Sequence, residues 1–390
     1  MKKIVLFSTI TAMSLFATNG DSLIGLGAQS RGMGGVGIAT YFGAENALIN
    51  PALISKSTGF EFDFGATYFS PKISINNGGA SEDSSAKQNM IPEVSLSQKV
   101  DDKLSYGIGM FGSAGMGVDF RDHLSHYNAR TNLLLMKVAP SIAYKVNPQF
   151  SVGFAPVLQY GALDISFIDG GGNQFGPGTS DDFGIGFELG ASYDIDNNSR
   201  VGLVYKSSID MKYDKQINTT NGAGSRFVPA GLTTKLTDHL EQPEEYGIGY
   251  SLDYGNYTFA LDYKKVNWSK AKGYKDFGWK DQDIYALGAK YEVAGTWYSI
   301  GYNYAKSPIP DQGSTQNGRV LNTLNYLMFP ATEETHYTLG YGTKLTKNLS
   351  LGLAAVIGAK NSTNVKNVMN QSLQTDHSEN SYTLSFKYNF

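Results

Sequence analysis

The chain ends in Tyr382-Thr-Leu-Ser-Phe-Lys-Tyr-Asn-Phe390, where every second side chain is aromatic or leucine and the last residue is Phe. Because successive side chains of a β-strand point to opposite faces, this alternation gives one apolar face and one polar face. If the aromatic side chains face lipid, the alternate ones face an interior, and these are Ser381, Thr383, Ser385, Lys387 and Asn389. The stretch therefore predicts a membrane-spanning strand.

The same alternation recurs along the chain and predicts about fourteen strands. Their ranges are 59–71, 90–99, 103–114, 131–145, 149–167, 182–195, 199–213, 243–254, 256–268, 282–293, 295–306, 334–345, 348–360 and 379–390. Short connections containing Asn, Asp or Gly, which tolerate the left-handed backbone of tight hairpins, alternate without a break with longer ones. This layout predicts an all-β, antiparallel up-and-down transmembrane β-barrel over residues 59–390, with periplasmic turns and extracellular loops.

The composition agrees with a barrel in a membrane. Tyr and Phe number 25 and 21, Gly numbers 45, charged residues make up only 17%, and the mean hydropathy is −0.25. Such barrels alternate apolar and polar residues and carry aromatic girdles at both interfaces. Beyond the N-terminus no run approaches 18 apolar residues, so transmembrane helices are not expected. With no Cys in the chain, nothing in it depends on disulfide formation.

The N-terminus predicts a secretory signal peptide over residues 1–20. Lys2 and Lys3 precede an apolar stretch over 4–17, and Ala17 or Gly20 offers a small residue for cleavage. The run is too short to span a bilayer as a helix. Together with the aromatic C-terminal strand, which resembles the signal for barrel assembly, it predicts a Gram-negative outer-membrane location. The expected partners are therefore the barrel assembly machinery and outer-membrane lipid.

Residues 21–58 do not alternate and are rich in Gly. A barrel of about fourteen strands leaves a lumen that leaks unless loops or a plug fill it. We therefore expect this segment to lie in the lumen as a hatch, since glycines let its backbone approach the wall. Asn50 followed by Pro51 is typical of the start of a helical turn, with Asn as the cap and Pro at the first position.

The segment beginning at Arg31 and reading Arg-Gly-Met-Gly-Gly-Val-Gly-Ile-Ala, with Asn50-Pro51-Ala52 after it, resembles the hatch of the FadL/TodX-type transporters of long-chain fatty acids and hydrocarbons. The resemblance continues over essentially the whole mature chain. It implies a monomeric barrel that takes up hydrophobic small molecules passively, with Arg31, Asn50, Pro51 and Ala52 in the gating hatch. It also implies a kinked third strand that opens the wall sideways. Gly112 and Gly115 lie where that kink is expected, because glycines inside a strand mark bulges.

The strand phase and the loop sequences suggest ligand-binding residues. An acidic head group needs a cation. Lys206, Lys264 and Arg31 are the candidates, because of the side of the wall that each is expected to face and its position in the chain. Two long loops carry apolar clusters that include Phe227 and Leu232, and Leu324 and Phe329. Exposed apolar clusters often mark binding sites. The alternative is that these loops pack on one another and cap the barrel.

Other functions fit the sequence less well. We find no G-x-S-x-G elbow, no acid–base set and no basic patch, so an enzyme, a cofactor and a nucleic-acid partner are not expected. His123 and His126 are three apart, but without a nearby Cys or a third partner they favour a solvated loop over a metal site. Long-chain fatty acids are the expected substrate, with aromatic or other hydrocarbons as the alternative. A polar-solute porin fits less well, because the hatch blocks the open lumen that a porin needs.

Overall fold

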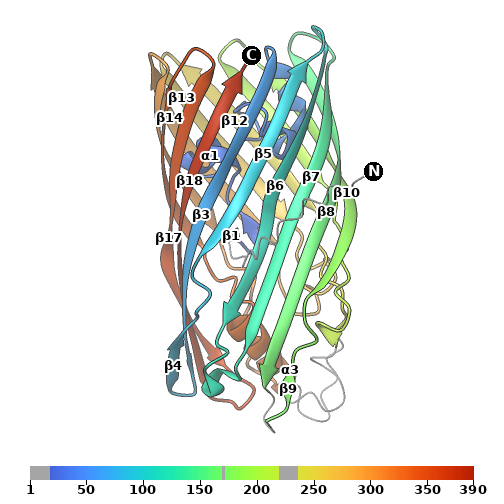
Figure 1. The fold of residues 1–390 in the computed structure, drawn as a ribbon, viewed down its shortest axis with the longest axis vertical. Helices are drawn as coiled ribbons and strands as arrows, with labels where there is room; N and C mark the ends of the chain where they lie inside the picture. Colours follow the sequence, from blue (N-terminus) through green and yellow to red (C-terminus); the bar gives the residue numbers. More distant parts are fainter. Residues whose placement is uncertain (1–17, 169–171, 219–235) are drawn as a thin grey trace, which may run out of the picture.

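The structure is a computed structural model that describes residues 18–168, 172–218 and 236–390. In these residues, fourteen long strands form a closed antiparallel barrel (Figure 1). In chain order they are β3 (Phe60–Asn77), β5 (Asn89–Lys99), β6 (Leu104–Asp119), β7 (Arg130–Lys145), β8 (Phe150–Ile168), β10 (Ser180–Asp194), β11 (Ser199–Lys206), β12 (Glu245–Tyr254), β13 (Tyr257–Val266), β14 (Gln282–Val293), β15 (Thr296–Ala305), β16 (Thr335–Lys344), β17 (Leu349–Lys366) and β18 (Ser372–Asn389). Each pairs with the next, and β18 pairs with β3 to close the wall. The predicted fold class is confirmed.

Tight turns lie at one end of the barrel and long connections at the other (Figure 1). In the hairpin between β12 and β13, Tyr254 pairs with Tyr257, and Gly255 between them has a φ of 60°. Glycine suits this left-handed position because it has no Cβ. The long connections carry β4 (Ala80–Asp83), η2 (Leu124–His126), β9 (Gln174–Phe175), α3 (Gln316–Thr323) and the π-helical turn η4 (Leu324–Met328). No helix in the described residues is long and apolar enough to cross a membrane.

The two faces of the wall follow the predicted alternation. On β13, Leu261 is 45% exposed on the outside, whereas its neighbour Asp262 is 1% exposed and faces the lumen. On β18 the predicted interior side chains Ser381, Thr383 and Ser385 are all buried. The sequence alternates because one face of each strand meets lipid and the other meets a polar, filled lumen.

Strands β3, β6, β17 and β18 extend further towards the long connections than the sequence predicted. For example, β18 begins at Ser372 instead of residue 379. Its outward side chains in this added part include Gln374 and Asp376, because the strand has left the lipid and its outer face is polar. A pattern that relies on an apolar outer face therefore misses these ends.

The strand predicted over 199–213 is wrong at its end, because β11 stops at Lys206. Ile209, Met211 and Tyr213 continue the alternation, but they are buried and turn over the lumen. An isolated bridge between Ile209 and Gln242 holds this inward turn. The apolar alternation there marks packing inside the barrel, not contact with lipid.

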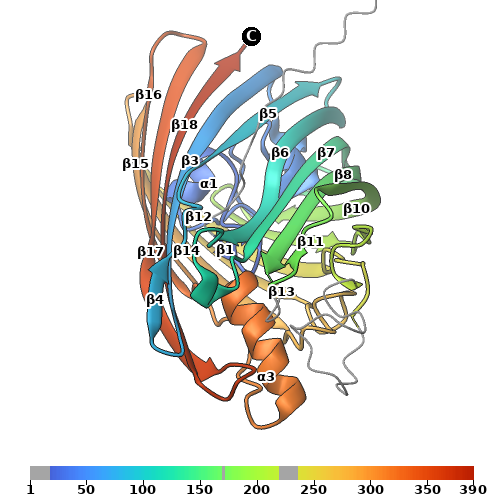
Figure 2. The same cartoon turned by 60° about the horizontal axis from the view of Figure 1, so that its bottom comes forward.

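Residues 18–59, called the N-terminal segment below, lie within the barrel (Figure 2). The segment contains β1 (Thr18–Asn19), β2 (Ser22–Leu23), α1 (Gly27–Gly32), α2 (Asn46–Ile49) and the 3-10 helix η1 (Pro51–Lys56), and most of its residues are buried. Helix α1 contacts the wall at β15 to β18, whereas η1 contacts β6, β7, β8 and β10. The segment therefore bridges the lumen. Residues 1–17, most of the predicted signal peptide, lie outside the described residues.

Candidate functional site

The backbone of the N-terminal segment is hydrogen-bonded to polar side chains of the wall. Ser299 donates to the carbonyl of Gly32 at 2.9 Å, and Asn303 donates to the carbonyl of Gly34 at 3.0 Å. The Gly34 N–H donates to the Thr338 hydroxyl at 2.9 Å. Irregular backbone buried in a lumen needs such partners, because an unpaired polar group away from water is costly.

Pairs of glycines on neighbouring strands let this backbone touch the wall. They are Gly153 with Gly190, Gly202 with Gly249, and Gly288 with Gly301. A Cβ on Gly153 would lie 2.2 Å from the Ala52 nitrogen, and one on Gly202 would lie 2.0 Å from the Ile38 oxygen. No side chain fits at these distances, so the glycine pairs form seats for the segment.

Asn50 joins the N-terminal segment to two wall strands. Its Nδ2 donates to the carbonyl of Ile38 at 2.7 Å, and to the carbonyls of Ala191 on β10 at 3.3 Å and Leu203 on β11 at 3.4 Å. Its Oδ1 accepts from the Ala52 N–H at 3.1 Å, which caps η1 as the sequence predicted. A side chain with both donors and an acceptor is therefore required at this position.

We predict that Asn50→Asp loosens the segment by about 1–3 kcal/mol, because a carboxylate would face three carbonyl oxygens and donate nothing. Hydrogen–deuterium exchange of the amides of 51–56 should rise accordingly. Asn46→Asp is the control, since Asn46 bonds within the segment, to the Phe42 N–H at 2.7 Å and the Thr40 carbonyl at 3.1 Å. Equal exchange of 51–56 in the two variants would contradict the role of Asn50.

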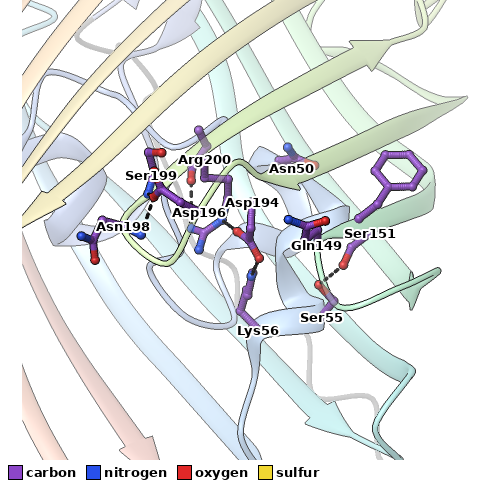
Figure 3. Close-up of polar contacts among 12 residues, drawn as sticks. Asn50, Ser55, Lys56, Gln149, Ser151, Asp194, Asp196, Asn198, Ser199 and Arg200 are labelled. Carbon is purple, nitrogen blue, oxygen red and sulfur yellow. Dashed lines mark hydrogen bonds and ion pairs between the residues drawn. The ribbon is translucent and has the colours of Figure 1, made fainter.

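A second attachment lies at the end of η1. Lys56 forms an ion pair with Asp194 of β10, and Arg200 of β11 donates to the same carboxylate at 2.6 Å (Figure 3). Arg200 also donates to the Ala39 carbonyl at 3.1 Å, and Ser55 donates to Ser151 at 3.0 Å. The end of the segment nearest the tight turns is thus tied to β8, β10 and β11.

The wall has a gap between β5 and β6. Their pairing runs from Lys99 opposite Ser105 to Glu93 opposite Phe111, and in the described residues it goes no further. The β6–β7 register shifts between Gly112 and Ala114, which is a bulge. The bulge lies at Ser113, next to Gly112, whereas Gly115 pairs regularly with Leu134. The sideways opening expected at Gly112 and Gly115 stays a prediction. β5 and β6 diverge at this level in Figure 1.

The start of the N-terminal segment occupies this gap. Ser22 of β2 pairs with Ala114 of β6, and the Gly115 N–H donates to the Asp21 carbonyl at 2.9 Å. The Asp21 carboxylate accepts from Gln242 at 2.7 Å and from the Tyr274 hydroxyl. Burial raises the pKa of Asp21 above its usual range, and these hydrogen bonds oppose that shift. The segment thus replaces β5 as the partner of β6.

A cavity of about 90 Å³ lies between the segment and the wall. Its apolar lining comes from Leu23, Leu26, Ile38, Leu48, Ile49 and Val266. Lysines 137, 206 and 264 line it together with Glu245, and it reaches the bulge at Ser113. The cavity therefore combines an apolar wall with ammonium groups and borders the gap.

Only one of the three lysines is paired in the described residues. Lys206 lies 3.6 Å from Glu245, whereas neither Lys137 nor Lys264 forms an ion pair there. Nearby Asp262 is already engaged, because its Oδ2 accepts from the Gly37 and Ile38 N–H groups at 2.8 and 3.0 Å. Glu188 and Glu245 act electrostatically on Lys137 and Lys264, but neither carboxylate forms an ion pair with them in the part of the chain that the structure describes.

The other predicted ligand residues lie elsewhere. Arg31 is fully buried inside the segment, does not line the cavity, and its guanidinium makes no hydrogen bond to any described residue. Leu324 and Phe329 are buried, and Phe329 stacks on Phe277 at 5.6 Å, so here the loops cap the barrel and present no exposed cluster. Phe227 and Leu232 lie outside the described residues.

A family model described as "Outer membrane protein transport protein (OMPP1/FadL/TodX)" matches residues 4–390. The chain belongs to this family. It is similar to the long-chain fatty acid transport protein of Escherichia coli, with 25% identity over 363 residues that cover 79% of this chain and 80% of the relative. It is also similar to outer membrane protein P1 of Haemophilus influenzae, with 24% identity over 395 residues, 81% of this chain and 82% of the relative.

Solved structures of similar fold include the toluene transporter TodX of P. putida, with a TM-score of 0.72, 17% identity, and coverage of 94% of this chain and 99% of that one. A FadL homologue from Pseudomonas aeruginosa has a TM-score of 0.73 at 15% identity, covering 95% and 100%. As a FadL/TodX-type protein, the chain is a Gram-negative outer-membrane channel for hydrophobic substrates and not an enzyme. In the described residues no group of three or more His, Cys, Asp or Glu is arranged to hold a metal ion.

Sequence reasoning missed Lys137 and the glycine seats. Both could have been found from the alternation of side chains along each strand. Lys137 falls on the inward-facing positions of β7, and Gly153 falls on those of β8. A charge or a glycine on the inward phase was visible in the sequence. What it meets across the lumen was not.

Proposed function

We propose that this FadL/TodX-type barrel takes up long-chain fatty acids passively and holds their carboxylate at Lys137 and Lys264. The observation that carries the proposal is the cavity in which these two unpaired ammonium groups face an apolar lining. A buried charge is costly without a partner, so the site favours an anionic head group. A neutral hydrocarbon would leave both ammonium groups unpaired.

Between the loops and the cavity, the apolar part of the substrate would meet buried apolar side chains. One cluster of buried apolar side chains runs from Trp279 and Phe329, among the long connections, to Leu48 and Ile49 beside the cavity. Each methylene removed from water along it contributes about 0.8 kcal/mol. We propose that a substrate captured at the loops moves inward by displacing side chains of this cluster, which needs no cofactor.

Transport requires the N-terminal segment to move. A cavity of about 90 Å³ has room for about three water molecules, far fewer heavy atoms than a long-chain fatty acid carries. Ser22 and Leu23 of β2 line the cavity and also fill the gap between β5 and β6. We therefore propose that the segment is a hatch, and that release of β2 opens a sideways exit through the wall.

The test is uptake of labelled oleate and labelled toluene by cells without their own transporter. Lys137→Gln/Lys264→Gln should lower oleate uptake about tenfold, since a charged hydrogen bond contributes about 1.5 kcal/mol or more, and should leave toluene uptake unchanged. Lys290→Gln is the control, because Lys290 also faces inward but pairs with Glu292 at 2.9 Å outside the cavity. Toluene uptake without oleate uptake by the unmodified protein would reject the fatty-acid proposal.

A further inference from the structure

A buried acidic cluster lies on β16 and β18, away from the cavity. His336 lies 2.6 Å from the Oε1 of Glu379, and His377 lies 3.7 Å from its Oε2. Glu333, just before β16, is 1% exposed and acts electrostatically on the same group. Neither the cavity nor the attachments of Asn50 and Asp194 involve these four side chains.

The cluster holds more acceptors than donors. In the described residues, the Oε2 of Glu379 and both carboxylate oxygens of Glu333 have no hydrogen-bond partner, and no Lys or Arg forms an ion pair with either residue. Burial and the neighbouring Glu379 raise the pKa of Glu333 to about 10. Two neighbouring buried carboxyl groups cannot both ionise unless a cation lies beside them, so the cluster can take a positive partner in place of a proton.

The group that touches this cluster is the backbone nitrogen of Thr18. It donates to the Oε1 of Glu379 at 2.7 Å. Residues 18–20 are built into the fold: Thr18 pairs with Leu23, and a Cβ on Gly20 would lie 2.6 Å from the Trp268 ring. Cleavage of the signal peptide after Gly20 would remove these contacts, whereas cleavage after Ala17 would keep all of them.

We propose that signal cleavage occurs after Ala17 and that the Thr18 α-ammonium it creates is the ligand of the Glu379–Glu333 cluster. A signal peptidase adds water across the Ala17–Thr18 peptide bond, so that Ala17 leaves as a carboxylate and Thr18 keeps a protonated amine. The ammonium has three donors where the peptide has one. Besides Glu379, a space of about 20 Å³ lined by Thr18 and His377 has room for about one water.

This anchor acts on the wall gap. Thr18 belongs to β1, β1 pairs with β2, and β2 pairs with β6 at Ala114. Binding of the ammonium therefore holds in place the strand that fills the gap between β5 and β6. The precursor lacks the charge, so the gap is secured only in the processed protein.

The first measurement is the N-terminal sequence and amine reactivity of the purified, folded protein. The mature chain should begin at Thr18. At pH 7.5, acylation of its amine by an N-hydroxysuccinimide acetate should be at least about sixfold slower than in Glu379→Gln, because a free α-amine has a pKa of about 7.7–8.0 and an increase of one unit lowers its fraction of reactive base about six- to eightfold at this pH. Exposed Lys347 serves as the internal reference.

Two further variants separate the anchor from misfolding. Glu188→Gln removes another buried wall carboxylate and should leave labelling of Thr18 slow. A mature chain with one extra N-terminal Ala keeps Glu379 but moves the ammonium by about 3.5 Å, and should label as fast as Glu379→Gln. A chain that begins at Asp21, or equal labelling of Thr18 in the unmodified protein and in both the Glu379→Gln and extra-Ala forms, would overturn the proposal.

Discussion

Replacing Gly288 by Val is expected to turn the closed barrel into one that conducts ions and admits polar solutes. A Cβ at Gly288 would lie 2.5 Å from the Met33 oxygen and 2.6 Å from the Met33 Cβ, so the N-terminal segment cannot keep its seat. A Cβ on the opposite glycine, Gly301, would lie as close to Gly34, so the segment has no room to shift towards that strand. Overpacking of this kind costs about 1–3 kcal/mol, which moves the ratio of seated to displaced segment about 5- to 150-fold.

The measurement is conductance of the purified protein in planar lipid bilayers. The control is Ala289→Val, because Ala289 is the next residue on β14, faces outward and receives the same added carbons. Gly288→Val should conduct and Ala289→Val should stay closed, with both barrels folded. If Gly288→Val stays as closed as the control, the glycine pairs do not seat the segment.

The sequence predicted the barrel well because lipid imposes a simple rule on one face of each strand. That rule alone assigns Leu261 to the outer face of β13 and Asp262 to the inner face, as the structure has them. The rule fails where lipid ends, as at Gln374 of β18, and where an apolar alternation turns inward, as at Met211. These errors have one cause: the pattern records what a side chain faces, not whether its backbone is paired.

The site was less predictable, because it depends on contacts across the lumen. Asn50 was predicted to cap η1, but its bonds to the carbonyls of Ala191 and Leu203 depend on the seating of the segment. Lys264 was assigned to the lumen by parity alone, and the structure places it on the cavity. Arg31 was grouped with it as a head-group cation, yet it is buried within the segment, which residue type and position do not reveal.

Cross-linking β2 to β6 is expected to abolish uptake reversibly. Ser22 and Ala114 are direct partners across the gap. Antiparallel partners have Cα atoms about 4.5–5.5 Å apart, within the range of about 4.4–6.8 Å that a disulfide spans. The chain contains no Cys, so Ser22→Cys/Ala114→Cys introduces the only thiols, which oxidise after export.

If substrate leaves through the gap, the oxidised double variant should take up none of the substrate that the unmodified protein transports, and a reducing agent should restore uptake. The control is Thr296→Cys/Thr343→Cys, which joins partners on β15 and β16 whose strands are already fully paired. That disulfide should leave uptake unchanged in both redox states, because it holds a part of the wall that does not open. Uptake that continues through the oxidised Ser22–Ala114 link would show that the substrate reaches the cell side by another route, with β2 in place. The N-terminal segment would then have to open on the side of η1, where Lys56 and Arg200 meet Asp194.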